Sequence, residues 1–119
     1  MSKLGKKINK LADEIYETSA SKGFWDIAEV SQFAIVPVKL ALIGDEVSEA
    51  LKVHRDEYDG SFSNNYMTKE QEQEFTEELA DIVIRTLDLA GGLDLDIGSS
   101  IEAKVEKNKT RPYRHGKRY

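Results

Sequence analysis

Hydrophobic residues recur along the chain at intervals of three and four, the spacing that places side chains on one face of an α-helix. The first series runs Leu4, Ile8, Leu11 and Ile15. It predicts a helix over residues 3–20, with Gly23 following its end. The sequence contains neither the alternating pattern typical of half-buried β-strands nor an internal repeat.

A second helix should begin near Val36, because proline is best tolerated in the first turn and Pro37 would then lie there. Its hydrophobic series keeps helical spacing up to about Asp56. Residues 59–67 are rich in turn-forming residue types and predict a loop. The second helix therefore ends in a connection that can reverse the direction of the chain.

A capping box marks the start of the third helix, since Thr68 is followed three residues later by Gln71. This helix should run to Ala90, where a pair of glycines would end it. A fourth helix is expected over residues 96–109, with Pro112 just beyond its end.

Four amphipathic helices with short connections predict an all-α fold, an antiparallel bundle of four to five helices. We expect a single domain over residues 1–119, with a basic tail over about 110–119. A chain of 119 residues divided among four such helices has a small core, so pairing of bundles into a dimer or tetramer would bury more of the apolar surface.

Composition limits the classes of function. The chain has no cysteine, which excludes a disulfide framework, a thiolate metal site and a cysteine nucleophile. Its longest apolar stretch is too short to span a bilayer, and no signal-peptide pattern is visible, so we expect a cytoplasmic protein without a membrane partner. The net charge of −5 argues against a general nucleic-acid binder.

The charges are unevenly distributed. Acidic residues dominate between Asp45 and Glu102, whereas the segment 104–119 carries seven lysines and arginines against one acid. An acidic middle and a basic end could be complementary parts of one site for a metal and an anion. They could equally be a solvated surface and a solvated tail.

Two pairs of carboxylates carry the candidate chemistry. Glu46 and Glu49 are three residues apart on the second helix, and Glu78 and Asp81 repeat the spacing on the third, so each pair lies on one helix face. From Glu49 to the loop the chain rises by roughly 14 Å, and from Thr68 to Glu78 it returns by roughly 15 Å. If the loop reverses the chain, the two pairs lie level with each other.

Facing carboxylates repel one another, and a hard divalent cation relieves that repulsion. Oxygen ligands without thiolates favour Mg²⁺, with Mn²⁺ as a substitute, and Mg²⁺ commonly binds substrate phosphates as well. Ferritin-like, zinc and Walker-type schemes each lack their required residues. The alternative is that these acids only form the solvated faces of two helices, as Glu72, Glu74 and Glu77 are expected to do.

The same residues resemble the signature of the MazG-like all-α nucleoside triphosphate pyrophosphohydrolases, a Glu-x-x-Glu motif followed after a spacer by Glu-x-x-Asp. The matching stretches are Glu46-Val-Ser-Glu49 and Glu78-Leu-Ala-Asp81, with similar flanks over 40–51 and 77–85. The segment 22–26 and the end of the chain, Lys104-x-x-x-Asn108-Lys-Thr-Arg111-Pro-Tyr-x-His115-Gly-Lys117, also resemble members of this family. The resemblance covers about residues 22–118.

The resemblance implies hydrolysis of a nucleoside triphosphate to the monophosphate and pyrophosphate, in a homodimer or homotetramer. The implied Mg²⁺ ligands are Glu46, Glu49, Glu78 and Asp81. Glu49 is our candidate for activating the attacking water. Residues that would contact the substrate are Lys104 and Asn108, Trp25 or Phe24 by stacking on the base or sugar, and Arg111 and Lys117 by attracting the polyphosphate.

Two alternatives remain open at this point. The chain could be an all-α dUTPase or a phosphoribosyl-ATP pyrophosphohydrolase, which share this architecture. It could also be a helical interaction module without enzymatic activity, in which Trp25 is only a core residue and the basic tail is only a solvated surface.

Overall fold

A computed structural model describes residues 2–26, 31–57 and 67–118 of the chain, and the described part is all-helical. Its elements are α1 (Lys3–Ser21), α2 (Gln32–Glu57), α3 (Lys69–Gly92), α4 (Ile97–Lys109) and a short 3-10 helix, η2 (Tyr113–Gly116). The loop expected over residues 59–67 lies outside the described residues except for Met67. No helix in the described ranges is both long and apolar enough to cross a membrane.

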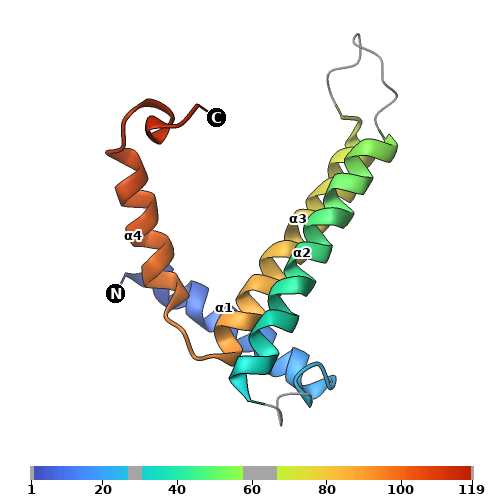
Figure 1. Ribbon diagram of the computed structural model, residues 1–119, viewed down its shortest axis with the longest axis vertical. Coiled ribbons are helices and arrows are strands. Elements are labelled where there is room, and N and C mark those ends of the chain that lie inside the picture. Colours follow the sequence, from blue (N-terminus) through green and yellow to red (C-terminus); the bar gives the residue numbers. More distant parts are fainter. Residues whose placement is uncertain (1, 27–30, 58–66, 119) are drawn as a thin grey trace.

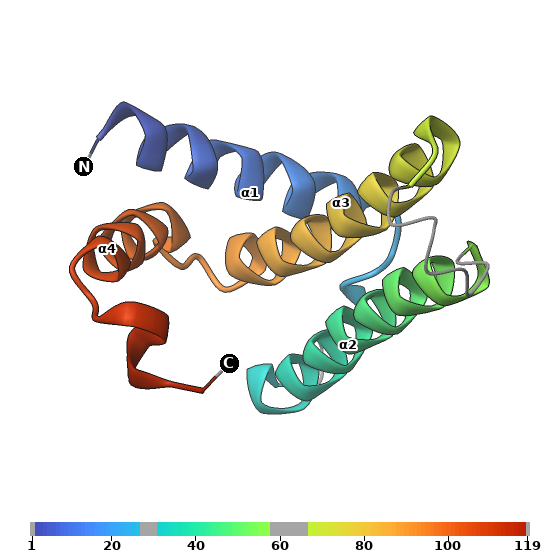
Figure 2. The same ribbon diagram turned by 90° about the horizontal axis from the view of Figure 1, so that it is seen from above.

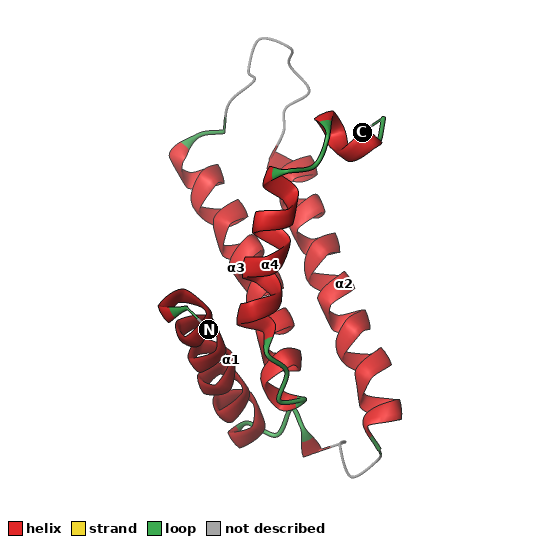
Figure 3. Ribbon diagram, turned by 90° about the vertical axis from the view of Figure 1, so that its left-hand side faces the viewer, coloured by secondary structure: helices red, strands yellow, loops and turns green. Residues whose placement is uncertain are grey.

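The two longest helices, α2 and α3, lie side by side and run in opposite directions (Figures 1 and 3). Helix α1 packs against α3 on the side away from α2, as Figure 2 shows from above. Helix α4 packs against α1 and stands apart from the upper part of the α2–α3 pair. The α2–α3 pair therefore carries both acidic motifs, while α4 packs on the same side of α1 as α3, next to the N-terminal half of α1 (Figure 2).

Three helix starts follow from local capping. The Ser2 hydroxyl accepts a hydrogen bond from the amide of Gly5 at the start of α1. The capping box at α3 is confirmed, since the Thr68 hydroxyl accepts from the Gln71 amide while the Gln71 side chain accepts from the Thr68 amide. Asp96 caps α4 by accepting from the amide of Ser99. The predicted spans of the first and fourth helices are confirmed to within one residue.

The predicted start of the second helix was wrong. Helix α2 begins at Gln32, so Pro37 lies inside it and not in its first turn. A proline there removes one backbone hydrogen bond, the one to the carbonyl of Phe33. Because Phe33 is only one residue from the helix start, a single bond near the end is lost and the helix continues through the proline.

Helix α3 ends at the predicted glycine pair, two residues later than Ala90, and the glycines have a second role in packing. Helix α3 continues through Gly91 and Gly92, and the chain turns at Asp94, whose φ is 55°. A Cβ atom on Gly91 would lie 2.4 Å from the Ala12 carbonyl oxygen of α1, and one on Gly92 would lie 2.2 Å from the ring of Trp25. These glycines are needed for the close approach of α1 and Trp25 to α3.

The single chain leaves much apolar surface exposed. Its radius of gyration is 17.4 Å, against about 13.5 Å for a compact domain of this length. Its accessible surface is 9215 Å², against about 6,500 Å² for a compact protein of this mass. Part of the excess comes from one side of α2, where exposed residues spaced by seven, seven and four share a face that points away from buried Ile35. This outer face of α2 consists of Phe33, Leu40, Val47 and Leu51.

Candidate metal centre

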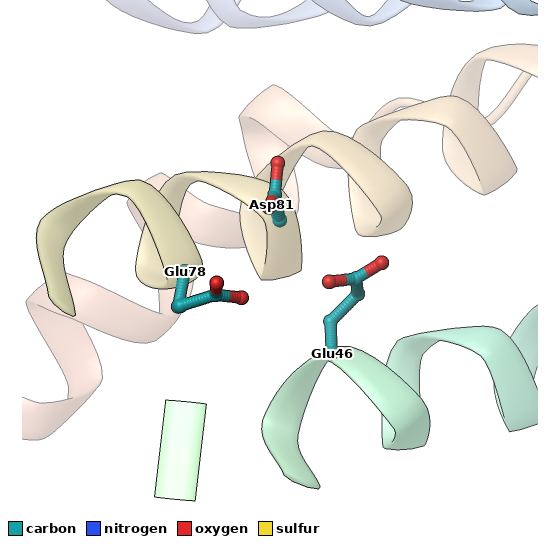
Figure 4. A group of neighbouring side chains, drawn as sticks. All are labelled: Glu46, Glu78 and Asp81. Carbon is teal, nitrogen blue, oxygen red and sulfur yellow. The ribbon is translucent and has the colours of Figure 1, made fainter. Parts of the chain in front are cut away.

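Three of the four predicted carboxylates meet between α2 and α3. Each of Glu46, Glu78 and Asp81 offers a carboxylate oxygen, and these three atoms all lie within 4.8 Å of one another. Figure 4 shows Glu46 projecting from α2 toward Glu78 and Asp81, which project from α3. Glu46 and Glu78 are half-buried, and Asp81 is exposed. We call these three residues the carboxylate cluster.

The antiparallel pairing explains why the cluster forms. Because α2 and α3 are antiparallel, residue numbers increase along α2 in the direction in which they decrease along α3. Pairs of residues, one from each helix, whose numbers add up to the same total therefore keep the same offset along the helix axes. Glu46 with Asp81 and Glu49 with Glu78 both sum to 127. The fourth predicted ligand, Glu49, is exposed and lies one turn from Glu46, next to the cluster rather than within it.

The electrostatics of the cluster are unfavourable in the absence of a cation. Partial removal from water raises the pKa of the Glu78 carboxyl above its ordinary value of 4.5, and repulsion by nearby carboxylates raises it further. These neighbours are, in decreasing order of effect, Asp81, Glu46, Glu49 and Glu77. A positive charge placed among these groups would be stabilised by all of them.

Replacing Glu78 with glutamine is therefore expected to raise the melting temperature of the metal-free protein. A carboxyl whose pKa is raised by folding costs stability at pH values above the folded-state pKa, and this cost disappears as the pH falls through that pKa to below 4.5. The gain from Glu78→Gln should thus be present at pH 7 and vanish near pH 4. Thermal melts with chelator at both pH values test this.

The exposed Glu17 of α1 supplies the matched control, since Glu17→Gln makes the same chemical change away from the cluster. It should leave the melting temperature nearly unchanged at both pH values. A Glu78→Gln protein that melts at or below the wild-type temperature at pH 7 would contradict this account of the electrostatics.

The cluster adjoins a positively charged side chain, Arg85, which was not among the site residues predicted from the sequence. The Arg85 Nε donates a hydrogen bond of 3.0 Å to Glu46 Oε1 across the α2–α3 interface, and both side chains are partly buried. Arg85 follows Asp81 by four residues, so both lie on one face of α3. That spacing was the available signal, because a cation one turn from an acidic motif is well placed to bind an anion beside a metal.

A cavity of 520 Å³ opens beside the cluster between α1 and α3. Glu46, Asp81 and Arg85 line it on the side of the cluster, and further polar residues line it as well, namely Glu14, Thr18, Ser19, Lys22 and Asp88. Its apolar wall includes Leu11 and Ile15 of α1, Ile84 of α3 and Phe24 from the segment after α1. This α1–α3 cavity thus combines an apolar surface with carboxylates and a guanidinium, which is the usual composition of a small-molecule site.

The two candidate aromatic residues lie in different surroundings. Phe24 is exposed and lines the α1–α3 cavity. Trp25 makes an edge-to-face contact with Tyr16, with ring centroids 5.1 Å apart, and its Nε1 donates to Asp88 Oδ1 at 2.9 Å. Between these two candidates, Phe24 is the residue that the structure brings to the cavity.

The remaining candidate substrate residues are on or after α4. Lys104 and Asn108 lie on α4, whereas Arg111 and Lys117 flank η2, and all four are exposed. Within one chain α4 packs on α1, and Figure 1 shows it standing apart from α2 and α3, the helices that carry the cluster. The structure therefore does not bring these four side chains to the carboxylate cluster of their own chain.

Comparisons of the chain with protein-family models, with curated proteins and with solved structures found no match.

Proposed function

We propose that this chain is a Mg²⁺-dependent nucleoside triphosphate pyrophosphohydrolase of the MazG-like kind, which converts a nucleoside triphosphate to its monophosphate and pyrophosphate. The observation that carries the proposal is the convergence of Glu46, Glu78 and Asp81 within 4.8 Å at the edge of the α1–α3 cavity. A metal-bound triphosphate at the cluster would have its nucleoside directed toward the apolar wall of that cavity.

The residues present fit a magnesium ion. The cluster consists of carboxylate oxygens alone, the donor type that Mg²⁺ prefers. The pKa of Glu78 is raised first by partial removal from water and then by repulsion from the neighbouring carboxylates, and a cation would relieve that repulsion. Glu46, Glu78 and Asp81 would hold the ion, with Glu49 adjacent. When bound, Mg²⁺ neutralises charge on the phosphate oxygens as it develops in the transition state.

The chain's own residues supply the other parts of the reaction. Glu49, exposed and one turn from Glu46, is our candidate to orient a water molecule and accept its proton as the water oxygen attacks the α-phosphorus. The bond from the α-phosphorus to the bridging oxygen then breaks, and pyrophosphate leaves. Arg85 holds the Glu46 carboxylate in position through Nε, and the residue also lines the cavity where phosphate oxygens would lie.

The exposed apolar side of α2 supports self-association of the chain. The outer face of α2 gives this helix apolar residues on two opposite sides, which is typical of a helix buried in an assembly. We therefore propose a homodimer or a homotetramer. Since α4 stands clear of its own cluster, Lys104 and Asn108, with Arg111 and Lys117, would contact the substrate bound by another copy.

Product analysis tests the function directly. The purified protein is incubated with Mg²⁺ and a panel of ribo- and deoxyribonucleoside triphosphates, and the products are separated by ion-exchange chromatography. We expect the monophosphate and pyrophosphate in equal amounts, and none without a divalent cation. Orthophosphate with the diphosphate would contradict the bond assignment.

The same panel separates the alternatives. Turnover of dUTP alone would identify a dUTPase, and turnover of phosphoribosyl-ATP alone would identify the corresponding pyrophosphohydrolase. Folded protein that turns over no nucleotide, and whose melting temperature does not respond to Mg²⁺, would support the interaction module.

A further inference from the structure

A buried ion pair joins α2 to α3 away from the carboxylate cluster. Lys39 of α2 is 4% exposed and Asp88 of α3 is 6% exposed, and Lys39 Nζ lies 3.5 Å from Asp88 Oδ2. The mechanism proposed above uses neither residue. Fully buried lysines and aspartates are rare, so this pair requires an explanation of its own.

Every polar atom of the pair is engaged. Asp88 Oδ1 accepts from Trp25 Nε1 at 2.9 Å, and Asp88 Oδ2 accepts from the Ser19 hydroxyl at 3.0 Å. Lys39 Nζ donates to the Phe24 carbonyl oxygen at 2.9 Å and lies 4.4 Å from the centroid of the Trp25 ring. The pair thus connects α1, the segment after α1, α2 and α3 at one point.

Stability alone does not account for such a pair. Removing two charges from water is costly, and apolar residues of similar volume often stabilise a helix interface as well or better. A buried ion pair instead discriminates between alignments of the helices. If α2 slid along α3 by one turn, Lys39 and Asp88 would both be buried without their partner, whereas an apolar pair would lose little.

The buried ion pair lies about two helical turns from the carboxylate cluster, along the same two helices. Lys39 precedes Glu46 by seven residues on α2, and Asp88 follows Asp81 by seven residues on α3. Because the helices are antiparallel, both steps go the same way, by about 10.5 Å or two turns. Lys39 with Asp88 therefore has the same sum, 127, as Glu46 with Asp81. The alignment that pairs the buried charges is the alignment that makes the acidic motifs level.

We propose that Lys39 and Asp88 are positioning residues for the metal centre, because their buried ion pair fixes the register of α2 against α3 that forms the carboxylate cluster. The inference rests on the metal-binding part of the proposed function. The affinity of the cluster for a divalent cation would then depend on Lys39 and Asp88, although neither side chain belongs to the cluster.

The test uses a double variant that removes both charges but keeps the shape. Lys39→Met with Asp88→Asn leaves a long apolar chain at 39 and a side-chain oxygen at 88 that can still accept from Trp25. We expect a folded protein with unchanged helix content by circular dichroism. Its Mn²⁺ affinity should fall by about 10-fold to 100-fold, the size of effect seen when groups that orient metal ligands are replaced.

The exposed ion pair of α4 supplies a matched control. Lys109 Nζ lies 2.7 Å from Glu106 Oε1, and Lys109→Met with Glu106→Gln also removes one positive and one negative charge. This control should bind Mn²⁺ with wild-type affinity. Lys39→Arg keeps the positive charge and should retain most of the Mn²⁺ affinity that the neutral variant loses. If Lys39 acted only through packing, keeping the charge would not be expected to preserve the affinity.

A second measurement tests the register without any metal. The chain has no cysteine, so spin labels can be placed at Lys52→Cys on α2 and Thr76→Cys on α3, both exposed positions. With labelled chains diluted into unlabelled protein, pulsed EPR should give one narrow distance in the wild-type background and a broadened or second distance in the neutral variant. An equally narrow, unchanged distance in the neutral variant would overturn the inference. If the wild type binds no Mn²⁺, the proposed function fails, and the distance measurement still decides whether the pair sets the register.

Discussion

Replacing Glu46 with glutamine is expected to lower the rate of nucleotide hydrolysis by about 100-fold to 1,000-fold, the loss typical when one preorganised transition-state-stabilising group is removed. Glu46 is the only member of the carboxylate cluster supplied by α2, and its carboxylate also bonds Arg85. An amide in its place is a weaker ligand for Mg²⁺ and no longer balances the charge of Arg85. Steady-state rates at saturating Mg²⁺ measure the effect.

The loss should not come from unfolding. Arg85 is about one-third exposed, so water can solvate its charge when its partner is neutralised. Glu46→Gln should accordingly melt close to the wild-type temperature without Mg²⁺ and should lack any rise when Mg²⁺ is added. Glu17→Gln on α1 is the control and should keep wild-type activity. A Glu46→Gln protein with wild-type turnover would exclude the cluster as the catalytic metal site.

Replacing Val47 with glutamate is expected to dissociate the proposed homo-oligomer, raising its dissociation constant by at least about 100-fold, as burial of an unpaired charge at the centre of an interface does. Val47 lies midway along the outer face of α2 and is 50% exposed in the single chain. The chain can therefore accommodate the carboxylate without disturbing its own fold. Sedimentation velocity over a concentration series measures the oligomeric state.

Val83→Glu on α3 is the matched control, because it makes the same substitution at a position 54% exposed and outside both α4 and the outer face of α2. A wild-type chain that is monomeric at all concentrations would contradict self-association through this face. So would an assembly that survives Val47→Glu and dissociates with Val83→Glu. If α4 of one copy serves the cluster of another, the Val47→Glu monomer should also lose turnover while retaining Mn²⁺ binding.

Features of the fold that depend on local chemistry could be predicted from the sequence. The capping box of Thr68 and Gln71 forms because its hydrogen bonds join residues three apart. The convergence of Glu46, Glu78 and Asp81 followed from the rise of two helices and one reversal between them. These inferences need only the periodicity of the helix, which is the same in every protein.

Features that depend on contacts between distant segments could not be predicted. The glycine pair 91–92 indicates the end of α3, but nothing in the sequence shows that Ala12 of α1 and the Trp25 ring lie too close to it for any larger residue. Lys39 interrupts an apolar run and gives no sign that its partner is Asp88, 49 residues away. Nor does the sequence show that α4 packs on α1, so that Lys104 and Asn108 lie away from the cluster of their own chain.

Titration of Mn²⁺ followed by EPR tests the central claim most directly, because free Mn²⁺ gives a strong signal that coordination diminishes. The account predicts a saturable site on each wild-type chain whose Mn²⁺ is displaced by Mg²⁺, with an affinity that weakens as the pH falls through the raised pKa of Glu78 and is much lower in Glu46→Gln. Wild-type protein that leaves the signal of free Mn²⁺ unchanged, or that binds it as tightly after Glu46→Gln, would contradict the claim that these carboxylates share a divalent cation.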